Sequence, residues 1–386
     1  MKKNLSLITL ICLVLGVVAG LVFKESVTAF SFIGSWYITL LKVMIGPVIF
    51  TSISYTIYKT NKNKDRLVLK SVVLFSIMFT VTFIITSLLV TIINPAKGFI
   101  NQEVAYQGAR ASFSIKDILF NWLPKSLSDL FTNPKVFAII VIAYLFGKFV
   151  KNDTVFDYVE KIKDILYKIL SIIMYLTPLA TFCLMAESTY KFGTMLIGVG
   201  IKYILCAYFC SIVCVVVVMI VPVYLFAGIK PFDYIKRVYR IWMMTISTCS
   251  SSATLPYTAK TCKEEFGIKD EVSDVVVPLG CTIHMCGGAV SFALLGLFCS
   301  RLYGVNISFV TYLLMLVSSL LINMAAPGIP GGGVVIGATY LEMLGIPLGF
   351  IGFYSGIYKL LDMIYTTLNV TGDISANILI DSYLKK

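Results

Sequence analysis

The stretch KLLDMIYTTLNVTGDISANILI, residues 359–380, determines the fold because it is an apolar helical segment that carries a stripe of polar side chains. At roughly 100° per residue, a helix places five of them within an arc of about 80°, and Tyr365 widens that arc to about 120°; the five are Lys359, Asp362, Thr366, Asn369 and Asp373. A charge inside a membrane-spanning helix costs about 2.5–3.5 kcal/mol on insertion scales. The stripe should therefore face protein, water or an ion. A polar seam between helices is the simpler interpretation, but these oxygen atoms also suit a hard cation such as Na⁺.

Composition places the whole chain in a membrane. Of its 386 residues, 58% are hydrophobic and only 13% are charged, and the mean hydropathy is +0.89. A soluble domain of this length carries more charge. The net charge of +12 does not indicate a nucleic-acid partner, because the basic residues lie at the ends of apolar runs, beside the lipid headgroups. The ten cysteines contain no C-x-x-C pair, so we expect no metal site beyond a coupling cation.

Six apolar runs in the first part of the chain predict membrane spans. They cover residues 5–23, 31–58, the run from the basic loop 59–70 to about 93, 136–150, 162–185 and 195–226. The first run lacks a small-residue cleavage site, which favours a retained span over a signal peptide. The basic clusters all fall on the same side of the predicted spans, so the positive-inside rule predicts cytoplasmic N- and C-termini and an external segment 94–135.

Two later segments are apolar but interrupted. The segment IWMMTISTCSSSATLPYTAK, residues 241–260, breaks at serines, and FVTYLLMLVSSLLINMAAPGIPGGGVVIGATYLEML, residues 309–344, breaks at prolines and glycines. Each predicts a re-entrant helical hairpin, because non-helical backbone is tolerated at membrane depth only inside protein or beside water. Residues 230–300 and 305–386 follow the same order of broken hairpin and long helix. Such paired interruptions in two repeats predict a transporter's binding site.

The segment PLGCTIHMCGGAVSF, residues 278–292, contains His284, which is the only histidine of the chain. A neutral, hydrogen-bonded packing residue is the simpler interpretation of His284, and a proton carrier is the functional one. Gly287 and Gly288 are expected to interrupt this helix and to free carbonyls for a cation. The serines at 250–252 suggest either a plain turn or a helix N-terminus that binds a carboxylate.

Several motifs together resemble the dicarboxylate/amino acid:cation symporters, the glutamate transporter family. They are STCSSSATLPYT at 247–258, PLGCTIHMCGGAV at 278–290, APGIPGGG at 326–333, DMIYTTLNVTGD at 362–373 and, upstream, ITLLKVMIGPVIFTSI at 38–53. The resemblance covers nearly the whole chain. It implies an all-α membrane protein of eight transmembrane helices and two re-entrant hairpins, built from inverted repeats. It also implies an elevator-type transporter that assembles as a homotrimer in the cell (inner) membrane.

The resemblance divides the chain into two parts. Residues 1–229 are the six N-terminal spans, which supply the scaffold and part of the transport domain. Residues 230–386 are the transport core: hairpin 1, helix 7, hairpin 2 and helix 8. Within this core the resemblance implies that Asp362 binds an amino group, that Ser251 and Ser252 lie beside a carboxylate, and that the tip 326–331, with Gly328, forms an external gate. It implies further substrate contacts at Tyr365, Thr366 and Asn369, and a cation site at Gly280, His284, Asn369 and Asp373.

Two departures from the family pattern are informative. Where members with acidic substrates carry an arginine, this chain has Tyr365, which cannot pair a carboxylate bidentately. The family's N-M-D-G-T appears here as HMCGG at 284–288, and the polar residues of its third span align with Phe75, Met78 and Phe79. The first departure predicts a neutral substrate, and the second predicts the loss of one Na⁺ site.

These observations predict a secondary active symporter of a small amino acid, most simply a neutral one, or of a related carboxylate. Coupling to Na⁺ and/or H⁺ is expected, with no organic cofactor. Two alternatives stay open: a passive, channel-like conductance, and symport of dicarboxylates or acidic amino acids with Lys359 as the cationic partner. An enzyme is not expected, because His284 and Cys286 are two residues apart and would lie on different sides of a helix.

Overall fold

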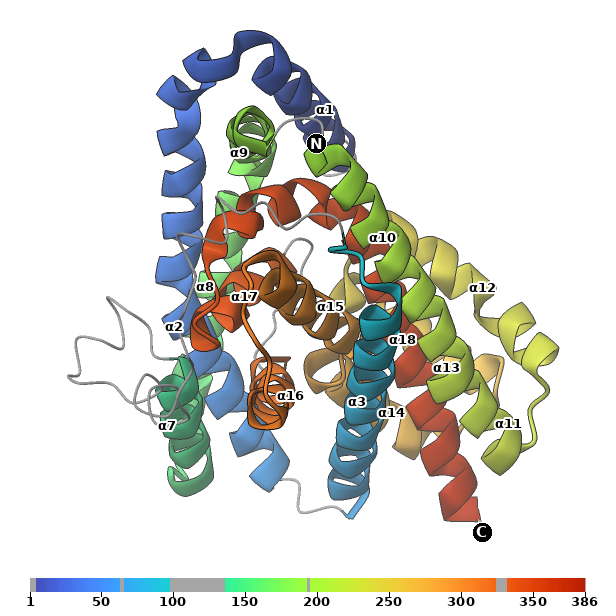
Figure 1. The fold of residues 1–386 in the computed structure, drawn as a ribbon. Helices are drawn as coiled ribbons and strands as arrows, with labels where there is room; N and C mark the ends of the chain where they lie inside the picture. Colours follow the sequence, from blue (N-terminus) through green and yellow to red (C-terminus); the bar gives the residue numbers. More distant parts are fainter. Residues whose placement is uncertain (1–4, 63–65, 98–135, 193–194, 324–331, 386) are drawn as a thin grey trace.

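The structure is a computed structural model that describes residues 5–62, 66–97, 136–192, 195–323 and 332–385. Within these ranges the chain forms helices and turns and contains no strand. The predicted all-α class is therefore confirmed. Figure 1 shows two groups of helices, one toward each side of the view; α16 and α17, which belong to the second group, lie near the middle.

The first group consists of five helices from the first half of the chain. They are α1 (Leu5–Phe23), α2 (Ser31–Lys62, after the 3₁₀ turn Lys24–Phe30), α7 (Val136–Phe149), α8 (Asp153–Ile173) and α9 (Thr177–Phe192). Helix α1 packs along α9, and α2 packs against α7, α8 and α9. Gly16 and Gly20, one turn apart on α1, lie against the backbone carbonyls of Phe182 and Ala186. A side chain at either glycine would force the helices apart, which is how small residues bring membrane helices together.

The second group holds all the elements after residue 195 and one earlier helix. The elements are α3 (Arg66–Ile93), α10 (Met195–Cys214), a π-helical turn (Val215–Ile220), α11 (Val221–Ala227), α12 (Pro231–Thr248), α13 (Ser251–Glu264), α14 (Asp270–Ile283), α15 (Cys286–Leu302), α16 (Phe309–Asn323), α17 (Gly332–Met343) and α18 (Ile351–Lys385). Helix α18 packs against α12, α13, α14 and α15, and α3 packs against α14 and α15. Nearly every residue of α18 from Ile351 to Ile378 is buried.

Within the described ranges, four helical stretches are long and apolar enough to cross a membrane, judged by length and composition: Ile11–Tyr37, Arg66–Ile93, Gly198–Ala227 and Asp270–Leu302. Many apolar side chains of α1, α2 and α3 lie exposed on the surface, among them Val22, Trp36 and Leu88. Lipid is the environment in which such a surface is stable. The count of eight spans stays a prediction.

Two predicted boundaries are wrong. The expected fifth span, 162–185, divides into α8 and α9 around the 3₁₀ turn Met174–Leu176. Pro178 explains the division, because proline has no N–H to donate and its ring restricts the residue before it. The interruption expected at Gly287 and Gly288 lies instead at His284 and Met285, whose backbones leave the helical conformation between α14 and α15.

Candidate functional site

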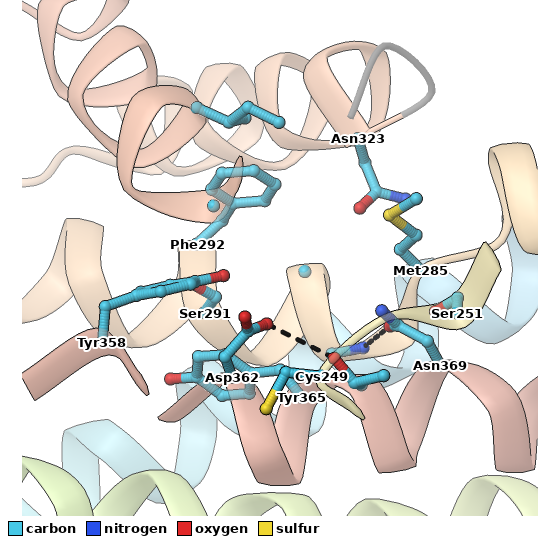
Figure 2. Close-up of a pocket in the computed structure, with 15 residues that line it drawn as sticks. Cys249, Ser251, Met285, Ser291, Phe292, Asn323, Tyr358, Asp362, Tyr365 and Asn369 are labelled. Carbon is cyan, nitrogen blue, oxygen red and sulfur yellow. Dashed lines mark hydrogen bonds between the residues drawn. The ribbon is translucent and has the colours of Figure 1, made fainter. Parts of the chain in front are cut away.

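A cavity of about 60 Å³ lies where the broken elements of the second group meet α18 (Figure 2). Its walls come from the α12–α13 junction, the first turns of α15, the end of α16, the start of α17 and the middle of α18. The interrupted segments thus do converge on one place, as the sequence predicts.

Helix α18 supplies the polar floor of the cavity. Asp362, Tyr365, Thr366 and Asn369 line it, and each is less than a tenth exposed. The Thr366 hydroxyl donates to Oδ1 of Asp362 over 3.3 Å. A carboxylate held at a cavity wall in this way can bind a cationic group such as an ammonium.

The α12–α13 junction supplies a helix N-terminus. Two residues, Cys249 and Ser250, join the helices; Cys249 has a left-handed backbone (φ 49°), and the hydroxyl of Ser250 accepts a hydrogen bond from the Ala253 amide over 3.2 Å. This capped turn places Ser251, the first residue of α13, in the cavity wall. Free amides and the helix dipole make such a terminus attractive to an anion. Ser252 points away: it is exposed, with its hydroxyl 3.9 Å from Sγ of Cys281.

A second polar centre lies one turn further along α18. Oδ1 of Asp373 is 3.0 Å from Nδ1 of His284, and Nε2 of His284 is 3.1 Å from Sγ of Cys286. All three residues are at most 1% exposed, and the ring of Phe75 stacks on the imidazole at 4.5 Å. A side chain at Gly280 would collide with the Asp373 carboxylate, so this helix must be bare there. An imidazole therefore occupies the side of Asp373 that faces α14 and α15.

Asn369 connects the two centres. Its Oδ1 accepts a hydrogen bond from the backbone N–H of Gly287 over 2.7 Å, so α18 holds the N-terminus of α15. Gly287 packs on the Tyr365 backbone, and a side chain there would clash with it. The glycines at 287 and 288 thus allow α15 to pack closely against α18 and α16, and they do not interrupt it.

The structure brings together most of the predicted site residues. Asp362, Tyr365, Thr366, Asn369 and Ser251 share the cavity, whereas Gly280, His284 and Asp373 form the separate centre. Ser252 joins neither, and Gly328 lies outside the described residues. Lys359 is half-buried and is not among the described residues that line the cavity.

One further expectation about this region was wrong. His284 and Cys286 were placed on different sides of a helix, but they contact each other because His284 and Met285 are not helical. The extended backbone turns both side chains to the same side.

Sequence reasoning also missed part of the cavity wall. Tyr358, Ser291 and Asn323 line it, and Phe292 covers its end. Tyr358 precedes Asp362 by one helical turn, so the period of α18 could have indicated it. Asn323 is a polar residue at the end of an apolar run, which was an available signal. Phe292 gave none, because an apolar residue in an apolar helix is ordinary.

Comparison with known proteins agrees with this architecture. The model of the sodium:dicarboxylate symporter family matches residues 5–383. The chain is 23% identical to the proton/glutamate-aspartate symporter of Bacillus subtilis over 401 residues, covering 100% of this chain and 96% of that protein. It is 26% identical to C4-dicarboxylate transport protein 1 of Ralstonia nicotianae, covering 99% and 92%, and 24% identical to the C4-dicarboxylate transport protein of Anaeromyxobacter sp. strain K, covering 99% and 90%. The chain therefore belongs to the sodium:dicarboxylate symporter family, whose members are integral membrane transporters and not enzymes.

Proposed function

We propose that this protein is a secondary active symporter of a small neutral amino acid, or of a closely related small carboxylate, in the cell membrane. The observation that carries the proposal is the presence of two opposite electrostatic features in one cavity. The Asp362 carboxylate lies on α18, and the N-terminus of α13 with Ser251 lines the same cavity. An ammonium group suits the first and a carboxylate suits the second. An α-amino acid carries both groups.

The neutral side chain is supported by the charges of the cavity. Among the described lining residues Asp362 is the one charged side chain, and residues 324–331 contain no lysine or arginine. Tyr365 stands where related transporters of acidic substrates carry an arginine, by the resemblance given above. A second carboxylate would therefore enter without a cationic partner, which is costly in a partly dehydrated site. The names of the relatives describe glutamate, aspartate and C4-dicarboxylates, so symport of acidic solutes is the competing function.

We propose that the coupling ion at the second polar centre is a proton, carried by the His284–Asp373 pair. His284 Nδ1 is 3.0 Å from Oδ1 of Asp373, and Phe75 covers the ring. The imidazole thus takes a side of the carboxylate that a Na⁺ ion would otherwise need, and a thiol neighbour is a poor ligand for a hard cation. A histidine is a suitable proton carrier in a membrane protein. The competing arrangement is Na⁺ held by Asp373, Asn369 and the backbone near Gly280.

The division of labour within the chain is also a proposal. Helices α3 and α10 pack with the C-terminal elements, and α1, α2, α7, α8 and α9 pack mainly with one another, although α1 and α9 also contact α18. This packing supports a scaffold and a transport domain that shares part of residues 1–229, moving as an elevator within a homotrimer. Cytoplasmic termini follow from the basic loops. Mass measurement in lipid nanodiscs tests the homotrimer. Protease accessibility of the termini tests their cytoplasmic location.

The test of the proposed function is uptake by the purified protein in proteoliposomes. Labelled serine, alanine, aspartate and succinate are offered under an inward Na⁺ gradient, an inward proton gradient, or neither. We expect accumulation of a neutral amino acid above equilibrium under the proton gradient. Flux that runs only downhill would indicate a passive conductance, and selective accumulation of aspartate or succinate would establish the competing substrate class. Thermal shifts give an independent check, because a ligand at about 100 times its Kd stabilises the folded protein by roughly 2.7 kcal/mol.

A further inference from the structure

Asn323, the last residue of α16, lines the cavity opposite Asp362 (Figure 2). Its side chain is 1% exposed, yet neither its amide oxygen nor its amide nitrogen has a hydrogen-bond partner among the described residues. Leaving a buried polar group without a hydrogen-bond partner destabilises the folded protein by roughly 1–3 kcal/mol. An amide in this state therefore calls for a partner that enters the cavity.

The neighbouring helix makes room for this amide. A Cβ atom at Gly288 would collide with the Asn323 side chain, so the amide occupies the volume that a side chain at position 288 would fill. The Phe292 ring lies on the same side of Gly288, 3.5 Å from the position that a Cβ atom would take there. Gly288 and Phe292 both line the cavity, so they form a bare and apolar surround for one polar group. Gly288 thus leaves room for the Asn323 amide at the edge of the cavity, where neither of its polar atoms has a partner among the described residues (Figure 2).

We propose that Asn323 determines substrate specificity, and that it selects amino acids whose side chain carries a hydroxyl or an amide. An asparagine amide both donates and accepts hydrogen bonds. A hydroxyl or a second amide can do both in return and so satisfies both atoms of Asn323. A carboxylate only accepts, so it could satisfy the amide nitrogen but would leave the amide oxygen without a donor. An aliphatic side chain would leave both atoms without partners.

This assignment rests on the proposed function, because it takes Asp362 and the α13 N-terminus to hold the amino and carboxylate groups. Asn323 lines the cavity on the side away from Asp362, so the side chain of such a substrate would lie next to it (Figure 2). Serine, threonine and asparagine are the natural candidates. Their apolar counterparts of similar size, alanine, valine and leucine, make matched competitors.

The experiment measures competition for uptake into proteoliposomes, using the pairs serine/alanine and threonine/valine. Wild-type protein should prefer the hydroxyl member of each pair by at least roughly tenfold, since a site built to bond a polar group rejects the analogue without it. Asn323→Leu, which keeps a similar volume, should bring the ratio to about one or reverse it. Gly288→Ala should do the same through displacement of the amide, and it keeps the test available if Asn323→Leu does not fold.

Asn377→Leu is the matched control, because Asn377 is also a fully buried asparagine on the helical bundle but lies outside the cavity and donates to Ser273. It should leave the ratio unchanged. The assignment is overturned if amino acids are transported and the ratio is the same in wild type, Asn323→Leu and Gly288→Ala. It is also overturned if Asn323→Leu changes only the cation concentration that uptake requires. If wild type transports none of the amino acids, the proposed function fails and the assignment fails with it.

Discussion

Two of the three aspartates of helix α18, Asp362 and Asp373, lie about three turns apart, and their surroundings differ. Asp362 lies at the wall of a cavity, beside Thr366, and a helix N-terminus lines the same cavity. Asp373 is 1% exposed and lies against a histidine, under a stacked phenylalanine. Both are acidic residues in an apolar helix, so the same sequence argument singles out both. Only the first adjoins space that a solute can enter.

The difference separates two tasks on one element. By the proposed function the groups around Asp362 hold a ligand that arrives and leaves, whereas Asp373 is already paired within the protein. A change at Asp362 should therefore affect transport more than folding, whereas a change at Asp373 should affect both. The following substitutions test this division.

Asp362→Asn should have the largest effect on transport. Removal of one partner from a buried charge pair costs about 2–5 kcal/mol in binding, which lowers affinity by at least roughly 30-fold. Uptake should fall to the background level while thermal unfolding is little changed. Asp381→Asn is the matched control, because Asp381 lies on the same helix outside the cavity and pairs with Lys385. Wild-type transport by the Asp362 variant would refute the role of this residue.

Asp373→Ala should lower both stability and cation dependence. The substitution leaves the buried His284 imidazole without its carboxylate partner, a loss of about 1–3 kcal/mol for a neutral group and more for a charged one. Cys286→Ala removes only the weaker thiol contact on the other ring nitrogen. Unfolding temperatures and cation concentration curves of the two variants give the comparison. Equal effects would mean that Asp373 is not the principal group of this centre.

His284→Asn should separate proton coupling from solute binding. An asparagine can keep a hydrogen bond to Asp373 but cannot carry a proton near neutral pH. We expect the variant to exchange solute across the membrane and to lose accumulation driven by a proton gradient without Na⁺. If that gradient drives no accumulation in wild type, or drives it equally in the variant, His284 is a packing residue.

Tyr365→Arg should shift preference toward aspartate by roughly tenfold, because a guanidinium adds a charge-assisted pair to a second carboxylate. Tyr365 lines the cavity and is 3% exposed, so the new charge would lie beside the ligand. Competition by aspartate measures the effect. Strong inhibition of the wild-type protein by aspartate would show that a tyrosine here does not exclude acidic substrates, and Lys359→Met would then test whether Lys359 supplies the charge.

Ser251→Ala and Ser252→Ala should give the smallest effects and differ from each other. Ser251 lies in the cavity wall, whereas Ser252 is exposed outside it. Loss of one hydrogen bond to a ligand costs about 0.5–1.5 kcal/mol. The apparent affinity should thus fall several-fold for Ser251→Ala and stay constant for Ser252→Ala. A larger loss for Ser252→Ala would place the carboxylate on the other side of this turn.

The sequence predicted the helical class and the convergence of its broken segments because these depend on local features. Apolar runs, prolines and a polar stripe with a helical period are visible without a structure. Asp362, Thr366 and Asn369 lie where that period puts them. The contact between His284 and Cys286 was missed because it depends on a break in the helix, and no proline or glycine marks the residue at which the break occurs.

The remaining surprises come from packing between segments far apart in the chain. The Asn323 side chain fills the space that a side chain at Gly288 would need, although the two residues are 35 positions apart in sequence. Ser251 and Ser252 are neighbours of the same type, and only the capping of α13 decides which of them reaches the cavity. Such choices depend on how whole helices meet, which a single sequence does not specify.

The hydrogen bond from Gly287 to Asn369 gives the two centres a shared element. One end of this bond belongs to the helix whose first turns line the cavity, and the other lies one turn from Asp373. Under the proposed function, a solute that strains or tightens this bond changes the free energy of ion binding at the His284–Asp373 centre. Thermodynamic reciprocity then requires the ion to change the affinity for the solute by the same factor. One amide contact can therefore serve as the linkage that makes two binding equilibria into cotransport.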